Sequence, residues 1–133
     1  MSNVQEFKRQ VETFKAKVRS MSEQRNRRII LYLFTLVNTE TPVREGVLRE
    51  NWELHPDYPG ATFVRERAHS PGEAVAMAMR RIASERINGR RWYFSNRTAY
   101  AFRIEFGYSV QKPGGMVRVS VRRVVGLIRR GAL

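Results

Sequence analysis

The first third of the chain carries the feature that most restricts its fold, a long stretch without a helix-breaking residue. Residues 3–41 contain neither glycine nor proline, and apolar residues recur there at alternating intervals of three and four positions. This spacing places the apolar side chains on one face of an α-helix. The members of this apolar stripe are Val4, Phe7, Val11, Phe14, Val18 and Met21.

The stripe pauses over the polar residues 22–28 and resumes at Ile29. Ile29 follows Val18 by eleven residues, which is about three helical turns, so the two parts share one face. We therefore predict a single helix of roughly 33 residues. Ser2 or Asn3 can serve as its N-cap. The alternative is a break within the polar stretch that folds the two halves into a hairpin.

The predicted helix is longer than the domain that carries it. At ~1.5 Å per residue it would extend about 50 Å, whereas a chain of this length has a radius of gyration near ~14 Å. The stripe must therefore find apolar cover beyond the domain, most simply on a neighbouring copy. A weaker alternative is an amphipathic helix on a membrane surface, where Glu6 and Glu12 would oppose the attraction of the lysines. We predict a subunit or partner interface at Val4, Phe7, Val11, Phe14 and Val18.

Three later stretches have strand-like patterns. Pro42 ends the long helix because a proline disfavours helical geometry in the preceding residue. Residues 47–55 alternate apolar and polar side chains, which is typical of a strand with one buried face. Residues 61–67 are a weaker strand candidate, and residues 91–95 form the third.

The clearest start signal belongs to a second helix over residues 71–87. Ser70 is a suitable N-cap, Pro71 suits the first helical position, and Glu73 completes a capping box. Asn88 and Gly89 supply the expected left-handed end. We predict a buried stripe of Val75, Met79 (or Ala78), Ile82 and Ala83.

The remaining elements are short. A helix is expected over residues 98–107, and residues 116–130 fit either a strand or a helix, of which we favour the helix. The fold class is therefore α+β, a long N-terminal helix packed on a small, mainly antiparallel sheet with two or three further helices. We predict one domain over residues 1–133, divided into the helix (1–38) and an α+β body (39–133). Its core should be anchored by Trp52, Trp92, Tyr100 and Phe106.

The chain is strongly basic, with 25 lysines and arginines against 12 acidic residues and a net charge of +13. Such an excess indicates nucleic acid, an anionic membrane surface or an acidic protein as a partner, unless it only solvates the surface. The basic run near the C-terminus is the main candidate for contacts with DNA phosphates or an acidic partner. It consists of Arg118, Arg122, Arg123, Arg129 and Arg130.

No pattern of catalytic, metal-binding or cofactor-binding residues is recognisable. The chain has no cysteine, and its two histidines, His55 and His69, lack the spacing of metal ligands. No phosphate-binding loop or nucleophile motif is present. Glu105 is the most notable acid. Burial would raise its pKa unless a basic partner such as Arg103 or Arg49 paired with it. We interpret it as a salt-bridge or hydrogen-bond acceptor at an interface rather than a catalytic group.

Three motifs in a fixed order resemble a known family. Residues 41–52 read TPVREGVLRENW, residues 93–101 read YFSNRTAYA, and residues 104–116 read IEFGYSVQKPGGM. This order is similar to that of the tail completion (neck) proteins of tailed bacteriophages, and the match spans about residues 4–125. The chain departs from the family pattern at residues 44–45, where Asp-Thr is usual, and at residues 98–99, where a proline often precedes the tyrosine.

The resemblance implies a structural virion protein that performs no chemistry. Such subunits form a ring, commonly a hexamer, at the head–tail junction. The ring joins the portal and adaptor proteins to the tail tube around the channel through which DNA passes without sequence-specific contacts. The expected location is the virion, after synthesis in the cytoplasm of the host bacterium, with neither a membrane nor a small-molecule substrate as partner. Within this family we expect a neighbouring subunit at Glu105, Tyr108, Gln111 and Met116.

Two alternative functions follow from the same residues. One is a different position in the same neck, as a tail terminator or a head–tail adaptor. The other is a small basic nucleic-acid-binding protein, whose affinity would fall linearly with salt on logarithmic axes.

Overall fold

The first helix, α1 (Asn3–Glu40), is unbroken over 38 residues. A computed structural model describes the chain except residues 1, 43–46, 61–71, 99–100, 102–104 and 107–113. Ser2 caps α1, accepting a hydrogen bond from the backbone N–H of Gln5 while the Gln5 side chain accepts one from the Ser2 N–H. The single long helix is confirmed, and the hairpin alternative is wrong.

The polar pause at residues 22–28 is a contact surface rather than a break. Asn26 donates a hydrogen bond of 2.7 Å to the side chain of Asn88, and Arg27 donates to the backbone carbonyls of Ile82 and Glu85 at 3.1 and 3.0 Å. The Glu23 carboxylate accepts hydrogen bonds from the backbone N–H groups of Ile87 and Asn88. The polar residues therefore attach α1 to the body at the point where its free half begins.

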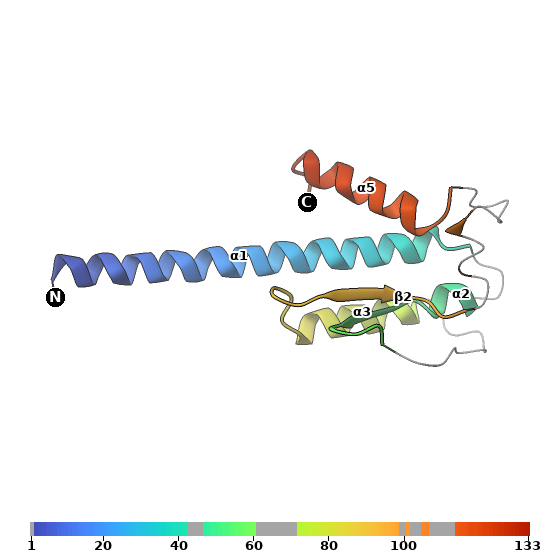
Figure 1. The fold of residues 1–133 in the computed structure, drawn as a ribbon, viewed down its shortest axis with the longest axis horizontal. Coiled ribbons are helices and arrows are strands. Elements are labelled where there is room, and N and C mark those ends of the chain that lie inside the picture. Colours follow the sequence, from blue (N-terminus) through green and yellow to red (C-terminus); the bar gives the residue numbers. More distant parts are fainter. Residues whose placement is uncertain (1, 43–46, 61–71, 99–100, 102–104, 107–113) are drawn as a thin grey trace.

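The body surrounds only the C-terminal half of α1. Helix α5 (Val117–Arg129) lies on one side of it, and helix α3 (Glu73–Ser84) with the sheet lies on the other (Figure 1). Strands β1 (Glu53–Pro56) and β2 (Trp92–Ser95) form a two-stranded antiparallel sheet, in which Leu54 pairs with Phe94. The α+β class, the long helix and the small antiparallel sheet are confirmed.

The core lies where α1, α3 and the strands meet. Phe34 and Val37 of α1 are each 1% exposed, and the Phe34 ring packs edge-on against Phe94 with 5.8 Å between ring centroids. Trp52 is buried and Trp92 packs against the core, as predicted. Phe106 is 54% exposed, so its prediction as a core anchor is wrong. Tyr100 lies outside the described residues.

The predicted strand over residues 47–55 is partly wrong. Residues Val47–Glu50 form a single helical turn, α2, and only the end of the stretch belongs to β1. Leu48 and Trp52 are both buried, and their spacing of four residues fits a helical turn as well as an alternating strand. The candidate strand over residues 61–67 lies outside the described residues.

Helix α3 is shorter than predicted at both ends. It begins after its N-cap residue Gly72, whose φ of +84° suits a residue without a side chain. Ser70, the predicted N-cap, lies outside the described residues. It ends at Ser84 because Glu85 is extended, and this lets Ile87 turn into the core at 3% exposure. The buried stripe is Ala74, Ala78 and Ile82, which confirms Ile82 and the alternative Ala78. Met79 and Ala83 are exposed, so their prediction as buried residues is wrong.

The C-terminal segment is a helix, which confirms our preference over a strand. Its end has the hydrogen bonds of a Schellman motif, in which the N–H of Ala132 donates to the carbonyl of Leu127 at 2.9 Å. Gly131, at a φ of +71°, provides the left-handed residue that this ending requires. The short helix expected over residues 98–107 lies largely outside the described residues.

Two phenylalanines on α1 test this arrangement. Phe34→Ala should lower the free energy of unfolding by about 3–5 kcal/mol because it empties a buried ring position. Phe7→Ala, at a side chain that is 66% exposed, should change it by less than about 0.5 kcal/mol. Urea denaturation followed by circular dichroism measures both, and a large cost at Phe7 would show that the N-terminal half packs on the body.

Candidate functional site

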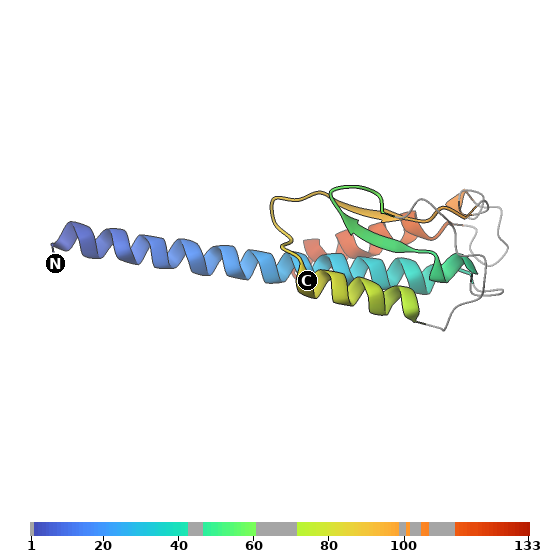
Figure 2. The ribbon, with the colours of Figure 1, turned by 90° about the horizontal axis from the view of Figure 1, so that it is seen from below.

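The free N-terminal half of α1, residues 3–21, is the most conspicuous surface and is called the arm below. Figures 1 and 2 show it running out from the body with no other drawn helix or strand beside it. Its apolar stripe faces solvent, with Phe7 and Phe14 each 66% exposed and Val4 63%. Val18 and Met21 are also exposed, and Val11 is partly exposed. The residues predicted at the N-terminal interface therefore form one continuous apolar surface without cover in the described part of the chain.

The C-terminal arginines are all exposed but do not act as one group. Arg118 is paired with Glu105 at 3.1 Å and lies over the Phe106 ring, and Arg123 approaches Glu40 at 3.5 Å. These two arginines hold α5 in place. Among the described residues, no ion-pair partner approaches Arg122, Arg129 or Arg130, so these three remain available to an anionic partner.

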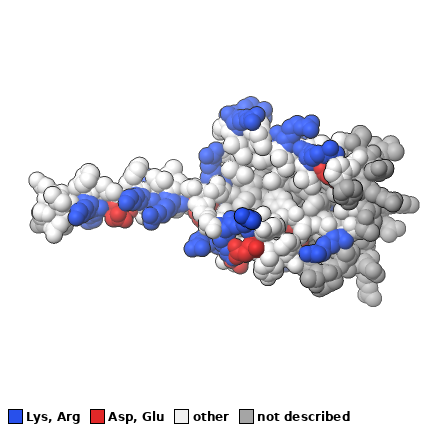
Figure 3. All heavy atoms as spheres, viewed as in Figure 1, with Lys and Arg blue, Asp and Glu red and all other residues white. Residues whose placement is uncertain are grey.

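The other basic residues are spread over the molecule. Figure 3 shows lysine and arginine side chains along the arm and across the visible face of the body, with few acidic side chains between them. Such a surface attracts anions over its whole extent rather than at one point.

Glu105 caps the N-terminus of α5. Its carboxylate accepts hydrogen bonds from the backbone N–H groups of Met116, Val117 and Arg118 at 2.9, 2.7 and 3.0 Å. Burial alone would raise the pKa of this carboxyl, but the three N–H groups together with the Arg118 side chain hold the pKa below its ordinary value. Glu105 is therefore a hydrogen-bond acceptor, as predicted. Its described basic partner is Arg118 rather than Arg49, and Arg103 lies outside the described residues.

The other residues predicted beside Glu105 have different positions. Met116 is 1% exposed and belongs to the core, so its assignment to a subunit contact is wrong. The sequence does not reveal this, because the side chain of an apolar residue just before a helix can face either the core or the solvent. Tyr108 and Gln111 lie outside the described residues.

The motif over residues 41–52 has a structural role that sequence reasoning missed. The Thr41 hydroxyl donates to the Val37 carbonyl and accepts from the indole N–H of Trp52, both at 2.7 Å. Arg49 donates to the Thr41 carbonyl at 2.7 Å, and Asn38 donates to the Arg49 carbonyl at 2.9 Å. These bonds satisfy the polar groups at the end of α1 while burying Trp52.

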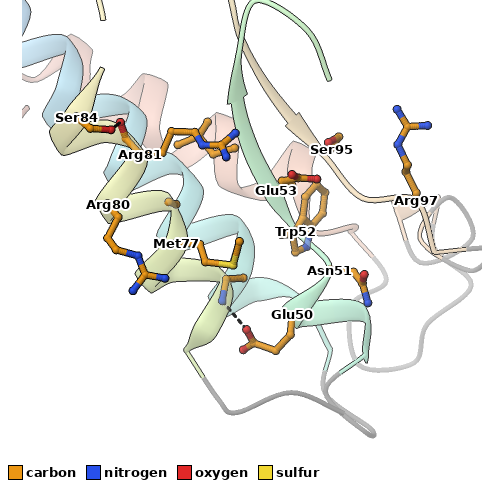
Figure 4. Close-up of a pocket in the computed structure, with 13 residues that line it drawn as sticks. Glu50, Asn51, Trp52, Glu53, Met77, Arg80, Arg81, Ser84, Ser95 and Arg97 are labelled. Atoms are coloured by element: carbon orange, nitrogen blue, oxygen red, sulfur yellow. Dashed lines mark hydrogen bonds between the residues drawn. The ribbon is translucent and has the colours of Figure 1, made fainter. Parts of the chain in front are cut away.

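Glu50 caps the N-terminus of α3, as Glu105 caps that of α5. Its carboxylate accepts from the backbone N–H groups of Gly72 and Ala74 at 2.9 and 2.7 Å (Figure 4). A pocket of about 310 Å³ lies between α3 and β1. Arg80, Arg81 and Arg97 are among its lining residues (Figure 4). The hydroxyls of its two serines, Ser84 and Ser95, donate to backbone carbonyls.

The described part of the chain holds no cluster of three or more acidic, histidine or cysteine side chains that suits a metal ion. His55 is engaged with the carbonyl of Pro56 and the ring of Tyr58, and His69 lies outside the described residues. Within the same described ranges, no helix combines the length and the apolar character needed to cross a membrane.

The Glu105 cap can be tested at Gly115. A Cβ atom there would lie 2.5 Å from the backbone oxygen of Glu105 and 2.9 Å from its carboxylate, at a φ of +85°. Gly115→Ala should therefore cost about 2–4 kcal/mol of unfolding free energy. Gly131→Ala is the matched control, because its φ of +71° is similar but the space around it is open, and it should cost only about 1 kcal/mol. Equal costs for the two variants in urea denaturation would contradict a close approach of Glu105.

Comparisons of the chain with models of protein families, with curated proteins and with solved structures find no match. The functional interpretation therefore depends on the residues and their geometry.

Proposed function

We propose that the chain is a structural subunit of the neck of a tailed bacteriophage. It would form a ring, commonly a hexamer, as the tail completion component that joins the portal–adaptor stack to the tail tube around the DNA channel. The three motifs over residues 41–52, 93–101 and 104–116 support this family, and so does the order in which they occur. A tail terminator or a head–tail adaptor of the same neck is the nearest alternative.

The observation that carries the proposal is the arm. Most of the stability of an amphipathic helix comes from packing its apolar face, and isolated helices of about this length are only marginally stable in water. An apolar stripe left in water therefore contributes nothing to the stability of the arm. Large exposed apolar surfaces on a single chain mark sites of association. A subunit that completes its packing only within an assembly accounts for this surface.

The basic charge supports the same proposal. A ring that surrounds DNA benefits from a net positive charge without needing base-specific contacts. Three exposed C-terminal arginines have no ion-pair partner among the described residues, namely Arg122, Arg129 and Arg130. They are suited to the lumen or to an acidic neighbour.

Assembly with partner proteins tests the proposal. The chain should form particles of much higher mass when it is mixed with the adaptor and tail-tube proteins of its phage, as measured by light scattering and cryo-electron microscopy. Phe14→Glu should abolish this assembly, because a charge would enter the stripe. Ala16→Glu adds the same charge two residues away, about 160° around the helix, and should leave assembly intact. A strictly monomeric chain in the presence of both partners would contradict the proposed function.

A nucleic-acid-binding protein is the second candidate, favoured by the same three arginines. In that case neutralising them together (Arg122→Gln, Arg129→Gln, Arg130→Gln) should lower the slope of log affinity against log salt by about 1 for each phosphate that the variant no longer neutralises. Fluorescence anisotropy with short duplex DNA measures this slope. Absence of DNA binding at low salt would exclude this candidate but would leave the neck subunit unaffected.

A further inference from the structure

The arm has the pattern of a helix that pairs with one other helix. Its stripe follows a strict seven-residue repeat, with Val4, Val11 and Val18 at one position and Phe7, Phe14 and Met21 at the other. A stripe of two positions per heptad is narrower than the face that packs on a globular core, and it is typical of the contact line between two helices in a coiled coil. The occupant of this surface is therefore expected to be an α-helix.

Farther along, α5 lies beside α1 next to the same face. Arg25 lies seven residues after Val18 and so continues the repeat, and its guanidinium donates a hydrogen bond of 3.1 Å to the carbonyl of Leu133. Helix α5 precedes Leu133 and lies beside the C-terminal half of α1, where Arg123 approaches Glu40 (Figure 1). Tyr32, seven residues after Arg25, is still 40% exposed, so α5 borders this face without covering all of it. A second helix placed on the arm would continue this packing end to end with α5.

The charges beside the stripe indicate what this second helix carries. The positions that flank the contact line in the arm hold Lys8, Lys15 and Lys17, together with the uncharged Asn3 and Gln10. In a pair of helices these are the positions that meet the flanking residues of the partner and select it by charge. An acidic partner is therefore favoured, and a basic one is disfavoured.

The acidic residues of the arm do not change this balance. Glu6 and Glu12 lie outside the flanking positions, and they pair with Arg9 at 2.6 Å and with Lys15 at 3.4 Å within the arm itself. These pairs are exposed, so they weaken the positive charge of the flanks only slightly.

A second copy of the chain does not supply the required charge. The arm of another copy would bring only lysines and uncharged residues to the positions that flank the contact line. A second open apolar ridge in the described part of a copy consists of Val121 and Val125 of α5, at 41% and 37% exposure, and it is bordered by arginines as well. The bordering residues of this ridge are Arg118, Arg122 and Arg129.

We propose that the arm binds an amphipathic α-helix of a different protein, whose apolar contact line is flanked by glutamate or aspartate, seated end to end with α5. The inference deepens the proposed function and rests on it for the claim that the partner is another component of the neck. The chemistry of the surface itself is independent of that claim.

Two synthetic helices of about four heptads test the charge argument on the full-length chain. Both carry the same valine and leucine contact line, one with glutamate and the other with lysine at every flanking position. In fluorescence anisotropy near 0.15 M salt (on the order of physiological strength), the glutamate peptide should bind about tenfold or more tightly than the lysine peptide. Phe14→Glu should abolish binding of the glutamate peptide, whereas Ala16→Glu should preserve it.

A charge-reversed arm provides the decisive variant. Combining Lys8→Glu, Lys15→Glu and Lys17→Glu changes only exposed side chains, so the fold should persist, as circular dichroism can check. The variant should prefer the lysine peptide. Equal binding of both peptides to the natural chain, or no binding of either, would overturn the proposal. So would a self-association in sedimentation equilibrium that Phe14→Glu removes, because the occupant would then be a second copy.

The outcomes separate this inference from the proposed function. If the chain assembles with neck proteins through the stripe but ignores the glutamate peptide, the acidic helix is wrong and the neck subunit stands. If the peptide binds as expected but no neck protein assembles with the chain, the surface chemistry stands and the neck assignment is wrong.

Discussion

The structure depends on glutamate side chains that bind backbone N–H groups of distant segments. Glu105 caps α5, Glu50 caps α3, and Glu23 of α1 accepts from the N–H groups of Ile87 and Asn88. Each carboxylate satisfies donors that a helix start or a turn cannot satisfy itself, and the negative charge also suits a helix N-terminus. The backbone N–H groups of Ile87 and Asn88 hold the pKa of Glu23 below its ordinary value, so this carboxylate stays ionised at neutral pH.

These attachments explain why the body occupies only half of α1. Glu23 and its neighbours Asn26 and Arg27 fix the loop after α3 at the middle of the helix, and the hydrogen bonds around Thr41 fix the other end. Between these two attachments, α1 buries the apolar side chains of Phe34 and Val37 in the core. N-terminal to Ser22 the described hydrogen bonds and ion pairs of the helix are local, such as Arg9 to Glu6. The arm is thus a helix whose stability depends on its continuation into the body, and its apolar side is left open.

Much of the fold could be predicted from local pattern, and the failures share one cause. The long helix, β2 and the α5 helix were found because their periodicity extends over many residues or agrees with their end signals. The strand predicted over residues 47–55 was wrong over Val47–Glu50 because Leu48 and Trp52 fit two periodicities, which the sequence pattern does not separate. The predicted stripe of α3 was wrong at Met79 and right at its alternative Ala78, because both residues are apolar and the pattern does not say which of them faces the core. The arm was predicted correctly as exposed apolar surface, whereas Met116 was placed on the surface although it belongs to the core.

The sequence by itself determined that α1 is one long helix with its N-cap at Ser2 or Asn3, the spacing of its apolar residues and the positive charge of its flanks, since each of these depends only on neighbours within a few turns. Tertiary structure decided which half of α1 is covered, which carboxylate serves which helix, and whether an apolar residue faces the core or solvent. These features depend on segments that lie far apart in the chain, and the energy of a cap or a buried side chain is realised only when the fold brings its partner within reach. For the same reason the lysines beside the stripe acquire a meaning only once α5 is seen to lie beside the C-terminal half of α1 and to leave the apolar stripe of the arm open.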